Sequence, residues 1–434
     1  MANKINPVLI SNIKDFIHQN YDDVFETFKR LNRVPEILFD LPETIKIIKP
    51  ALQSIPGMEV FDVEGAPCCL VGILKNGEGP VIAYRTDLDG LRINDLTNTD
   101  WSSKIGGNSH SCGHSTHIVS ALMIAKIMSA FRNEWSGTFL VYGQASEEGG
   151  TMGLGSGAQC MIKNGLLTKF PKPSKVLAIH CDPFRPAGLV RLCKGVAFAH
   201  TSLFEIKICG EAAHGGMPFK GIDTILLACR IVEGLQSIVS RELNPKTEPA
   251  VLTIGSFHAG KAANAVPAQA DLSGTIRCFS EETYHKICNA IRRIMNGLAQ
   301  SMGVPQSDWP ELVLYPVFAP QLINDVTLGD QLETTYRAVL TKPDNIELNN
   351  TPEFYGEDFA NYGLTGDKIP IFLTWIGSVE PKKFDDKGQP KEELPSLHDG
   401  SYTPYWDKND QTDTMRTAAL TQSCALLNLF ASTD

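Results

Sequence analysis

The chain has 434 residues, 43% hydrophobic and 20% charged, which is an ordinary composition for a folded protein of two or three domains. A net charge of -10 without a basic block, and no apolar run long enough for a membrane span or a secretory signal, argue against nucleic acid and membranes as partners. Eleven cysteines, an odd count without a CxxC pair, favour a reducing compartment, so we expect a cytoplasmic protein.

The first half of the chain alternates between helical and strand-like patterns. Helical periodicity predicts helices over residues 9–30, 43–54 and 114–131. Short apolar runs between them predict strands over residues 80–86, 138–144 and 175–180. Alternation of this kind is typical of an α/β domain with a largely buried sheet.

The pattern changes near residue 200. Alternating apolar and polar residues predict a strand over residues 202–209. Further strands are predicted over 250–257, 270–279 and 311–317, and helical patterns cover 222–242 and 281–301. The order β-α-β-β-α-β is that of ferredoxin-like domains, so we predict an inserted α+β domain over residues 195–317. After this domain the α/β pattern returns, with helices predicted over residues 325–341 and 411–431 and a strand over 370–376. Residues 1–194 and 318–434 would therefore form one domain.

Side chains that can bind metal ions follow the predicted strands of the first half. They are Asp87 and Asp89 after the first strand, Glu147 and Glu148 after the second, His180 at the end of the third, and Cys112 and His114 just before a helix. Because open α/β sheets bind ligands beyond the carboxyl ends of their strands, we expect these residues at one rim. Histidine nitrogen, cysteine sulfur and carboxylate oxygen are the ligands that zinc and related ions take.

These residue types predict a hydrolytic metal centre. A metal ion acidifies a bound water, and a carboxylate beside it can take the proton and return it to a leaving amine. Adjacent Glu147 and Glu148 cannot share one face of a strand, so we expect a loop in which one binds metal and the other faces the water. Nucleophilic catalysis by Cys112 with a histidine base is an alternative, but it leaves the glutamates and the other histidines unexplained.

Segments spanning most of the chain match a known family in its order. They are AYRTDLDGLRI (83–93), HSCGHSTH (110–117), GQASEEGG (143–150), GSGAQCMIKNGLL (155–167), CGEAAHGGMPFKGID (209–223), NAVPAQADLSGTIR (264–277), GEDFANY (356–362) and LHDG (397–400). The chain resembles the dinuclear metal amidohydrolases that include aminoacylases, hippurate hydrolases and auxin (indole-3-acetyl)–amino acid conjugate hydrolases. The resemblance implies a zinc-peptidase-like catalytic domain with a mixed sheet flanked by helices, and a ferredoxin-like domain that serves as a lid and dimerisation surface.

The resemblance also implies roles for individual residues. The ligands of two divalent metal ions, either zinc or manganese with cobalt also open, would be Cys112, His114, Glu148, His180 and His398. Cys112 would bridge the two ions, Glu147 would be the general base, and Asp87 would orient a ligand. His398 lies in a polar loop, 379–410, that fold reasoning alone would assign to a linker.

In the inserted domain, the resemblance points to three residues. His214 would stabilise the oxyanion that forms on the amide carbonyl, often in the site of the partner subunit of a homodimer or higher homo-oligomer. Asn264 and Arg277 would hold the substrate carboxylate, for which the two-pronged guanidinium is suited. A surface charge at the edge of a strand is the alternative interpretation of Arg277.

The expected reaction is hydrolysis of the amide bond of small-molecule N-acyl amino acids or related conjugates, which releases an acid and a free amino acid. The alternatives are a dipeptidase or aminopeptidase of the same superfamily, and a non-catalytic homologue. The chain departs from the family pattern at Ser115, where aspartate is usual, and at Ala145, where proline is usual. Asn32 and Val34 stand where histidines are usual.

Overall fold

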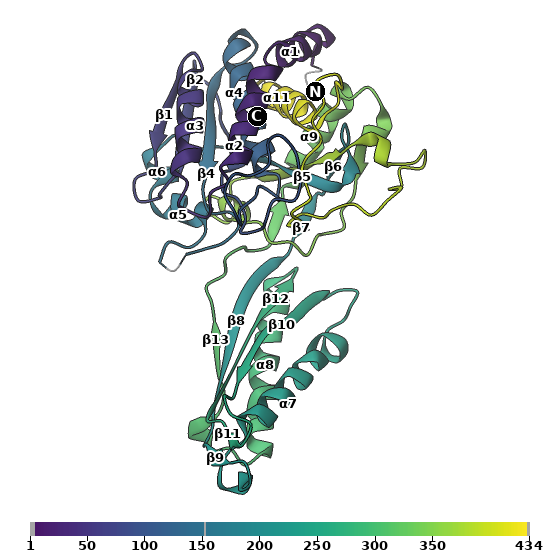
Figure 1. Cartoon of the computed structure of the whole chain (residues 1–434). Coiled ribbons are helices and arrows are strands. Elements are labelled where there is room, and N and C mark those ends of the chain that lie inside the picture. Colours follow the sequence, from purple (N-terminus) through teal and green to yellow (C-terminus); the bar gives the residue numbers. More distant parts are fainter. Residues whose placement is uncertain (1–4, 152, 432–434) are drawn as a thin grey trace. The chain divides into compact units, whose positions relative to one another are not determined.

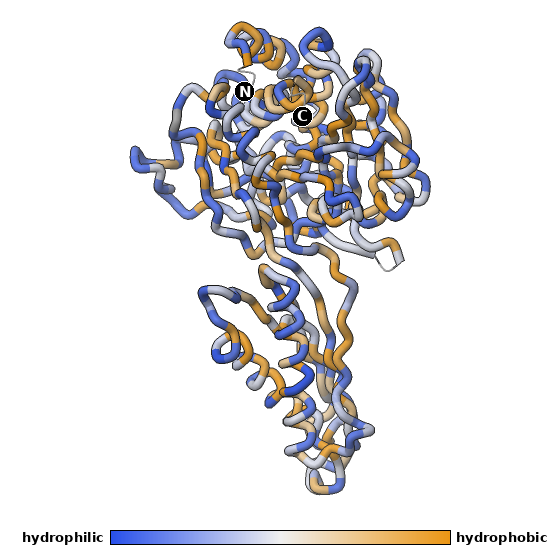
Figure 2. The backbone as a smooth tube through the Cα atoms, turned by 180° about the vertical axis from the view of Figure 1, so that it is seen from behind, coloured by the Kyte–Doolittle hydropathy of each residue, from blue (hydrophilic) through white to orange (hydrophobic). Residues whose placement is uncertain are grey.

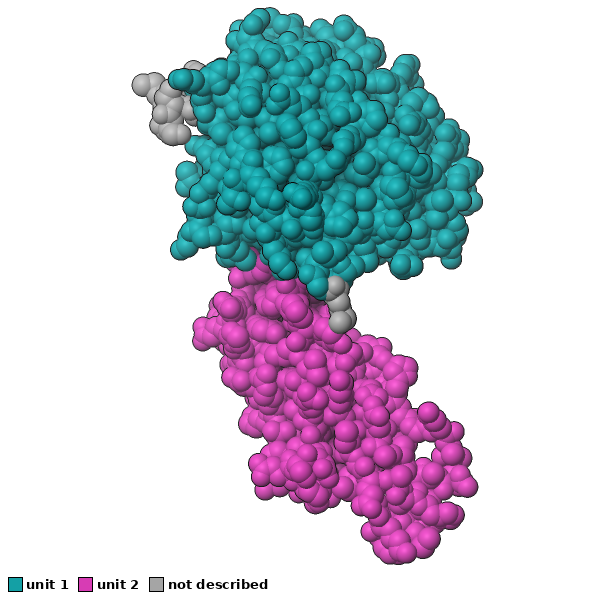
Figure 3. Space-filling view, turned by 90° about the vertical axis from the view of Figure 1, so that its left-hand side faces the viewer, with its two compact units in different colours: residues 1–195, 323–351, 358–434 teal, residues 196–322, 352–357 magenta. Residues whose placement is uncertain are grey.

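The computed structural model describes residues 5–151 and 153–431, and the chain forms two compact units (Figure 1; Figure 3, teal and magenta). Unit 1 comprises Met1–Gly195, Ile323–Thr351 and Asp358–Asp434, and unit 2 comprises Val196–Leu322 and Pro352–Glu357. The second stretch of unit 2 belongs there because the Ala199 amide donates to the backbone carbonyls of Glu353 and Tyr355.

An eight-stranded mixed sheet forms the centre of unit 1. In spatial order its strands are β1 (Met58–Asp62), β2 (Leu70–Asn76), β4 (Gly137–Gln144), β3 (Val81–Asp87), β5 (Lys175–Pro186), β16 (Ile371–Val379), β6 (Val190–Leu192) and β15 (Ile346–Leu348). Strand β3 is parallel to β4 and β5, β16 is parallel to β5, and β1 and β2 extend the sheet antiparallel. All nine residues of β16 are buried. Figure 2 shows hydrophobic stretches of the backbone within each unit.

The helices of unit 1 are α1 (Pro7–Gln19), α2 (Tyr21–Arg33), α3 (Pro42–Gln53), α4 (His114–Ala130), α5 (Gly157–Lys163), α6 (Leu166–Lys169), α9 (Val326–Val339), α10 (Ala360–Gly363) and α11 (Thr414–Ala431). Helices α4 and α11 pack together and are buried on nearly every side, as expected for helices without a polar face. The prediction of one helix over residues 9–30 was wrong. The chain breaks at Asn20, whose side-chain amide donates to the Phe16 carbonyl and ends α1.

Strands β3 and β5 of the unit 1 sheet separate partway along their length. Strands β3 and β5 pair only from Ile82–Lys175 to Tyr84–Leu177, and β5 then continues alongside β16. The prediction that the strand ends at His180 was therefore wrong, because β5 extends to Pro186. His180 nevertheless lies beyond the last pair of the β3–β5 ladder, where the two strands separate.

Unit 2 has the element order β8 (His200–Cys209), α7 (Thr224–Ser237), β10 (Ala250–Ala259), β12 (Gln269–Cys278), α8 (Glu281–Ser301) and β13 (Glu311–Leu314). Its four strands form an antiparallel sheet in the order β10-β12-β8-β13, whose core includes Ile206, Leu272 and Ile291. The described residues also form two short ladders: β9 (Ala213–His214) with β11 (Ala265–Val266), and β7 (Gly195–Phe198) with β14 (Leu322–Asn324). In the part of the chain that the structure describes, no helix is long and apolar enough to cross a lipid bilayer.

Candidate metal centre

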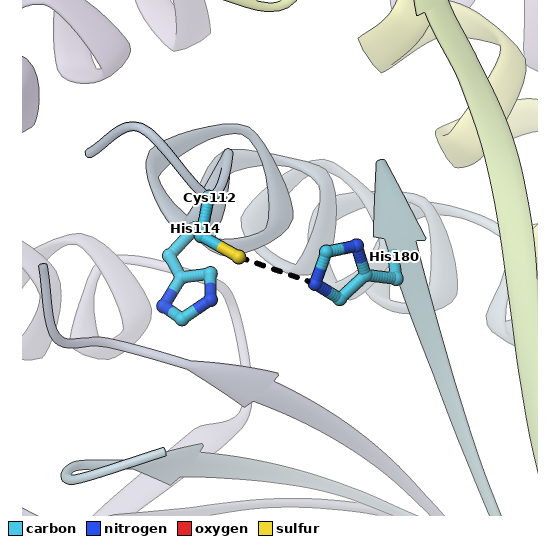
Figure 4. Close-up of side chains that lie close together, drawn as sticks. All are labelled: Cys112, His114 and His180. Carbon is cyan, nitrogen blue, oxygen red and sulfur yellow. Dashed lines mark hydrogen bonds between the residues drawn. The ribbon is translucent and has the colours of Figure 1, made fainter. Parts of the chain in front are cut away.

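The structure brings together all five predicted metal ligands in unit 1. Cys112 and His114 come from the turn that begins α4, and His180 comes from β5; their side chains point toward one another (Figure 4). Cys112 Sγ lies 3.5 Å from His180 Nε2. Glu148 follows β4, and its carboxylate oxygens lie 3.6 Å from His114 Nε2 and 3.2 Å from His398 Nε2.

Cys112 is shared by two groups of potential ligands. One group is Cys112, His114 and His180, and the other is Cys112, Glu148 and His398; within each group the ligand atoms lie within 4.8 Å of one another. Two adjacent groups that share one residue could hold two neighbouring ions, with Cys112 belonging to both groups. Thiolate, imidazole and carboxylate together suit zinc and similar ions.

Unsatisfied atoms at the centre of the cluster support this interpretation. Among the described residues, none is a hydrogen-bond partner of His114 Nε2 or Glu148 Oε1, although both atoms are buried. Buried polar atoms are almost always paired, because an unpaired one costs about 1–3 kcal/mol. A cation between these atoms would satisfy both, so the residues fit a metal ion.

Hydrogen bonds to backbone carbonyls determine which nitrogen of each buried imidazole faces the cluster. Nδ1 of His114 lies 2.8 Å from the Asp89 carbonyl, and Nδ1 of His180 lies 2.9 Å from the Cys181 carbonyl. A carbonyl only accepts, so each Nδ1 carries its proton and donates it. Each Nε2 is then the nitrogen that faces the cluster and that a metal ion would bind in place of a proton, an orientation typical of metal-binding histidines.

The electrostatics of the cluster also favour a cation. Burial raises the pKa of the Cys112 thiol, and the carboxylates of Glu148 and Glu147 raise it further, so a thiolate there needs positive charge beside it. Burial lowers the pKa of His114, but Asp87, with other carboxylates, outweighs it and brings the pKa to about 10. A metal ion that binds here therefore replaces protons.

Asp87, the predicted orienting residue, is fully buried at the end of β3. Its Oδ1 lies 2.8 Å from His117 Nδ1, its Oδ2 accepts from Arg85 Nη1 at 2.8 Å, and Oδ2 also lies 3.7 Å from His114 Nε2. Burial raises the pKa of Asp87, but the charges of His114, His117 and Arg85 outweigh it and hold the pKa well below its usual range. Asp87 is thus an anchored carboxylate next to a ligand.

The two glutamates lie on a tight loop after β4. Ser146, directly before them, has a φ of 56°, a conformation that non-glycine residues seldom adopt. The loop packs against the start of α5, where a Cβ at Gly157 would lie 1.6 Å from the Ala145 carbonyl oxygen, so only glycine fits. Glu147 is 5% exposed, and its Oε2 lies 3.7 Å from His114 Nε2.

His398 reaches the cluster from the polar loop. Its φ is 64°, and its backbone amide donates to the Ser111 carbonyl at 3.1 Å, which ties the loop to the segment that contains Cys112. Its side chain is 52% exposed, unlike the other ligands. Strained backbone conformations, such as those of Ser146 and His398, are often found at functional sites.

The three predicted residues of unit 2 lie in two places. His214 lies on β9 and Asn264 directly precedes β11, its partner strand; the Gly215 amide donates to the Asn264 carbonyl at 2.7 Å, and both predicted residues are exposed. Arg277 lies near the far end of β12, where Nη1 donates to the Phe354 carbonyl at 2.7 Å. The length of β12 separates Arg277 from the other two.

The sequence patterns assigned no role to His117 or Arg85 and gave Asp89 only as a possible metal ligand, and all three are buried around the cluster. The spacing of His114 and His117 on one helix could have indicated His117, because residues three apart share a helix face. Two departures from the family pattern also contact each other: the Asn32 side-chain amide donates to Ser115 Oγ at 3.0 Å. The structure thus gives Ser115 a neutral buried partner.

Comparison with known proteins identifies the family of the chain. Residues 83–401 match the model of the peptidase family M20/M25/M40. The chain is 32% identical to N-acetylcysteine deacetylase of Bacillus subtilis (strain 168) over 349 residues, 80% of this chain and 86% of the relative. It is also 32% identical to hippurate hydrolase of Campylobacter jejuni over 332 residues, 76% of this chain and 82% of the relative.

A solved structure extends the agreement to the fold. The YXEP protein of Bacillus subtilis, described as a dinuclear metal binding peptidase from the M20 family, has a TM-score of 0.74 and 26% identity, over 95% of this chain and 99% of that one. Together with the ligand groups of the cluster, this likeness supports a site for two divalent metal ions. The chain therefore belongs to the peptidase family M20/M25/M40 and is a hydrolytic enzyme that acts on amide bonds.

Proposed function

We propose that the protein hydrolyses N-acyl amino acids at the cluster of unit 1 and that Cys112, His114, Glu148, His180 and His398 hold two divalent metal ions there. The observation that carries the proposal is the membership of Cys112 in both ligand groups, with the Glu147 carboxylate beside them. When bound, such ions acidify a water molecule and polarise the amide carbonyl. Zinc and manganese are the first candidates and cobalt a third, and the thiol favours the softer ions.

In this proposal Glu147 moves the proton. Its carboxylate is nearly buried, yet it is adjacent to Glu148 and close to His114, so it faces the place where water and substrate meet. Glu147 accepts a proton from the attacking water and returns it to the nitrogen of the departing amine. Asp87 acts through His114 and His117, whose positions its carboxylate fixes.

For unit 2 we propose the role of lid and dimerisation surface. Gln269 and Arg277 lie eight residues apart on β12, which corresponds to about 26 Å at 3.3 Å per residue. His214 pairs with β11, the short strand that precedes Gln269 in the chain. That separation suits a homodimer in which His214 and Asn264 of one copy, and Arg277 of the other, bind one substrate. His214 then donates to the oxyanion, and Arg277 and Asn264 hold the substrate carboxylate.

For the compartment we propose the cytoplasm. Each of the eleven cysteines is a free thiol, and eight of them are buried. Free thiols persist in a reducing environment, where disulfides are rare.

A panel of substrates tests the choice of substrate class. We expect the protein to release amine from N-acetyl, N-benzoyl or indole-acyl amino acids at least about tenfold faster, by kcat/KM, than from dipeptides with a free amino group. The family also contains enzymes named carboxypeptidase, such as thermostable carboxypeptidase 2 of Saccharolobus solfataricus, 26% identical over 376 residues. Faster cleavage of dipeptides would move this chain to the peptidase class.

A further inference from the structure

Asp89 is a buried aspartate whose contacts reach three of the proposed catalytic groups. Its side chain is fully buried, and each carboxylate oxygen accepts a different backbone amide: Oδ1 from Glu147 at 3.0 Å and Oδ2 from Glu148 at 3.1 Å. Its backbone carbonyl accepts from His114 Nδ1 at 2.8 Å. One residue therefore contacts the proposed base, a proposed ligand from the same loop, and a proposed ligand from α4.

The backbone around Asp89 is itself fixed. On one side the Leu88 amide donates to the Gln144 carbonyl at 2.8 Å, and on the other the Gly90 amide donates to the Glu36 carbonyl at 2.7 Å. A Cβ at Gly90 would lie 2.8 Å from the Ser109 carbonyl oxygen, so the chain is closely packed at this point. The position of Asp89 is thus fixed, so that it can in turn fix the residues that it contacts.

The loop that carries Glu147 and Glu148 needs such a fixed contact. Ser146 has a left-handed conformation, and two successive amides, those of Glu147 and Glu148, point into the protein rather than into a strand or helix. Unpaired buried amides would cost about 1–3 kcal/mol each, and the carboxylate of Asp89 offers one acceptor oxygen to each of them. The two hydrogen bonds to Asp89 fix the backbone of Glu147 and Glu148. The side chains of these two residues can then serve different proposed roles, as base and as metal ligand.

We propose that Asp89 is a positioning residue for the hydrolysis, which holds Glu147, Glu148 and His114 in one geometry through a single side chain and its own carbonyl. The proposal rests on the proposed function of the cluster. It assigns no proton transfer and no contact with substrate to Asp89. Its effect is on how precisely the base and two ligands are placed, to which rates are sensitive.

The first test is Asp89→Asn. An asparagine keeps one acceptor oxygen but turns an NH2 group toward the other backbone amide, so one of the two pairs is lost. At saturating metal we expect kcat to fall about 10–100-fold, as for other partners that orient metal ligands, with KM within about twofold. Metal content, measured separately, should show weaker binding of one ion. A kcat equal to that of the wild type, or a change in KM alone, would overturn the proposal.

A matched control is Glu36→Gln, which changes the side chain and keeps the backbone carbonyl that accepts from Gly90. The Glu36 carboxylate also accepts two successive backbone amides, those of Glu43 at 3.0 Å and Thr44 at 2.8 Å, but at the start of α3 rather than at the cluster. We expect this variant to lower the unfolding temperature and to leave kcat within about twofold of the wild type. An equal loss of kcat in both variants would mean that Asp89 serves stability alone and would refute positioning.

A second measurement needs neither a variant nor activity. In the metal-free wild type, hydrogen exchange at the amides of Glu147 and Glu148 should be slower by at least about 100-fold than at the exposed loop residue Asp386, because a buried carboxylate holds them. Exchange as fast as at Asp386 would contradict the proposal even if Asp89→Asn fails to fold. A wild type that hydrolyses no acyl amino acid but shows this protection would instead count against the proposed function.

Discussion

Glu147→Gln is expected to lower kcat by about 10²–10⁴-fold while both metal ions stay bound. The amide keeps the size of the side chain but cannot accept a proton, and proton transfer by a placed carboxylate contributes about that factor. The five proposed ligands are unchanged, because Glu148 belongs to the group with Cys112 and His398, whereas among the described residues Glu147 lies near ligand atoms only in a group with His114 and Glu148 and in one with Glu357 and Asp358. Steady-state kinetics with N-acyl amino acids and metal analysis of the same sample measure both quantities.

The control for this prediction is Glu134→Gln. Glu134 is an exposed glutamate in the short 3-10 turn Arg132–Glu134, and we expect no change in kcat beyond about twofold. A Glu147→Gln variant with wild-type turnover would remove Glu147 from the reaction. Loss of the metal ions from that variant would show instead that Glu147 is itself a ligand.

Cys112→Ser is expected to reduce both metal content and activity. Cys112 is the sulfur common to the two ligand groups, and a serine hydroxyl is a far poorer ligand because it does not ionise near neutral pH. We expect the protein to bind one ion or none in place of two. The loss of kcat/KM should exceed the 10–100-fold that is typical when only an outer partner of a metal site is removed. Metal analysis after dialysis and steady-state kinetics provide the measurements.

Cys288→Ser separates this effect from the cost of losing a buried thiol. Cys288 is 2% exposed in the core of unit 2, so its replacement should lower stability by about 1–3 kcal/mol without changing metal content. If Cys112→Ser retained two ions and full activity, Cys112 would not bridge them. The two ligand groups would then belong to separate sites or to none.

Sequence patterns located the elements that carry the ligands, for a physical reason. Parallel strands with buried faces are continuous apolar runs, and their polar ends are visible in the sequence at Asp87 and at the glutamate pair. Helix α8, predicted over residues 281–301, has those same bounds because its N-cap Ser280 and its apolar stripe are local features. Elements whose cues are local were predicted well.

The rest depends on long-range contacts that no local pattern encodes. The apolar run of β2 was not singled out, although it pairs with both β1 and β4 in the sheet. His398 is 218 residues from His180, and only tertiary contacts such as its amide bond to Ser111 bring its loop to the cluster. The contacts of Asp89 are also invisible in the sequence, because they bind backbone amides rather than particular side chains.

The most direct test of metal-dependent amide hydrolysis is a titration of metal-free protein with zinc or manganese, followed by release of amine from an N-acyl amino acid. We expect chelated protein to be inactive, activity to return as ions are added, and full activity to require about two ions per chain. Amine release that survives complete removal of metal would contradict the account. So would a protein that binds two ions at the cluster yet cleaves neither acyl amino acids nor dipeptides.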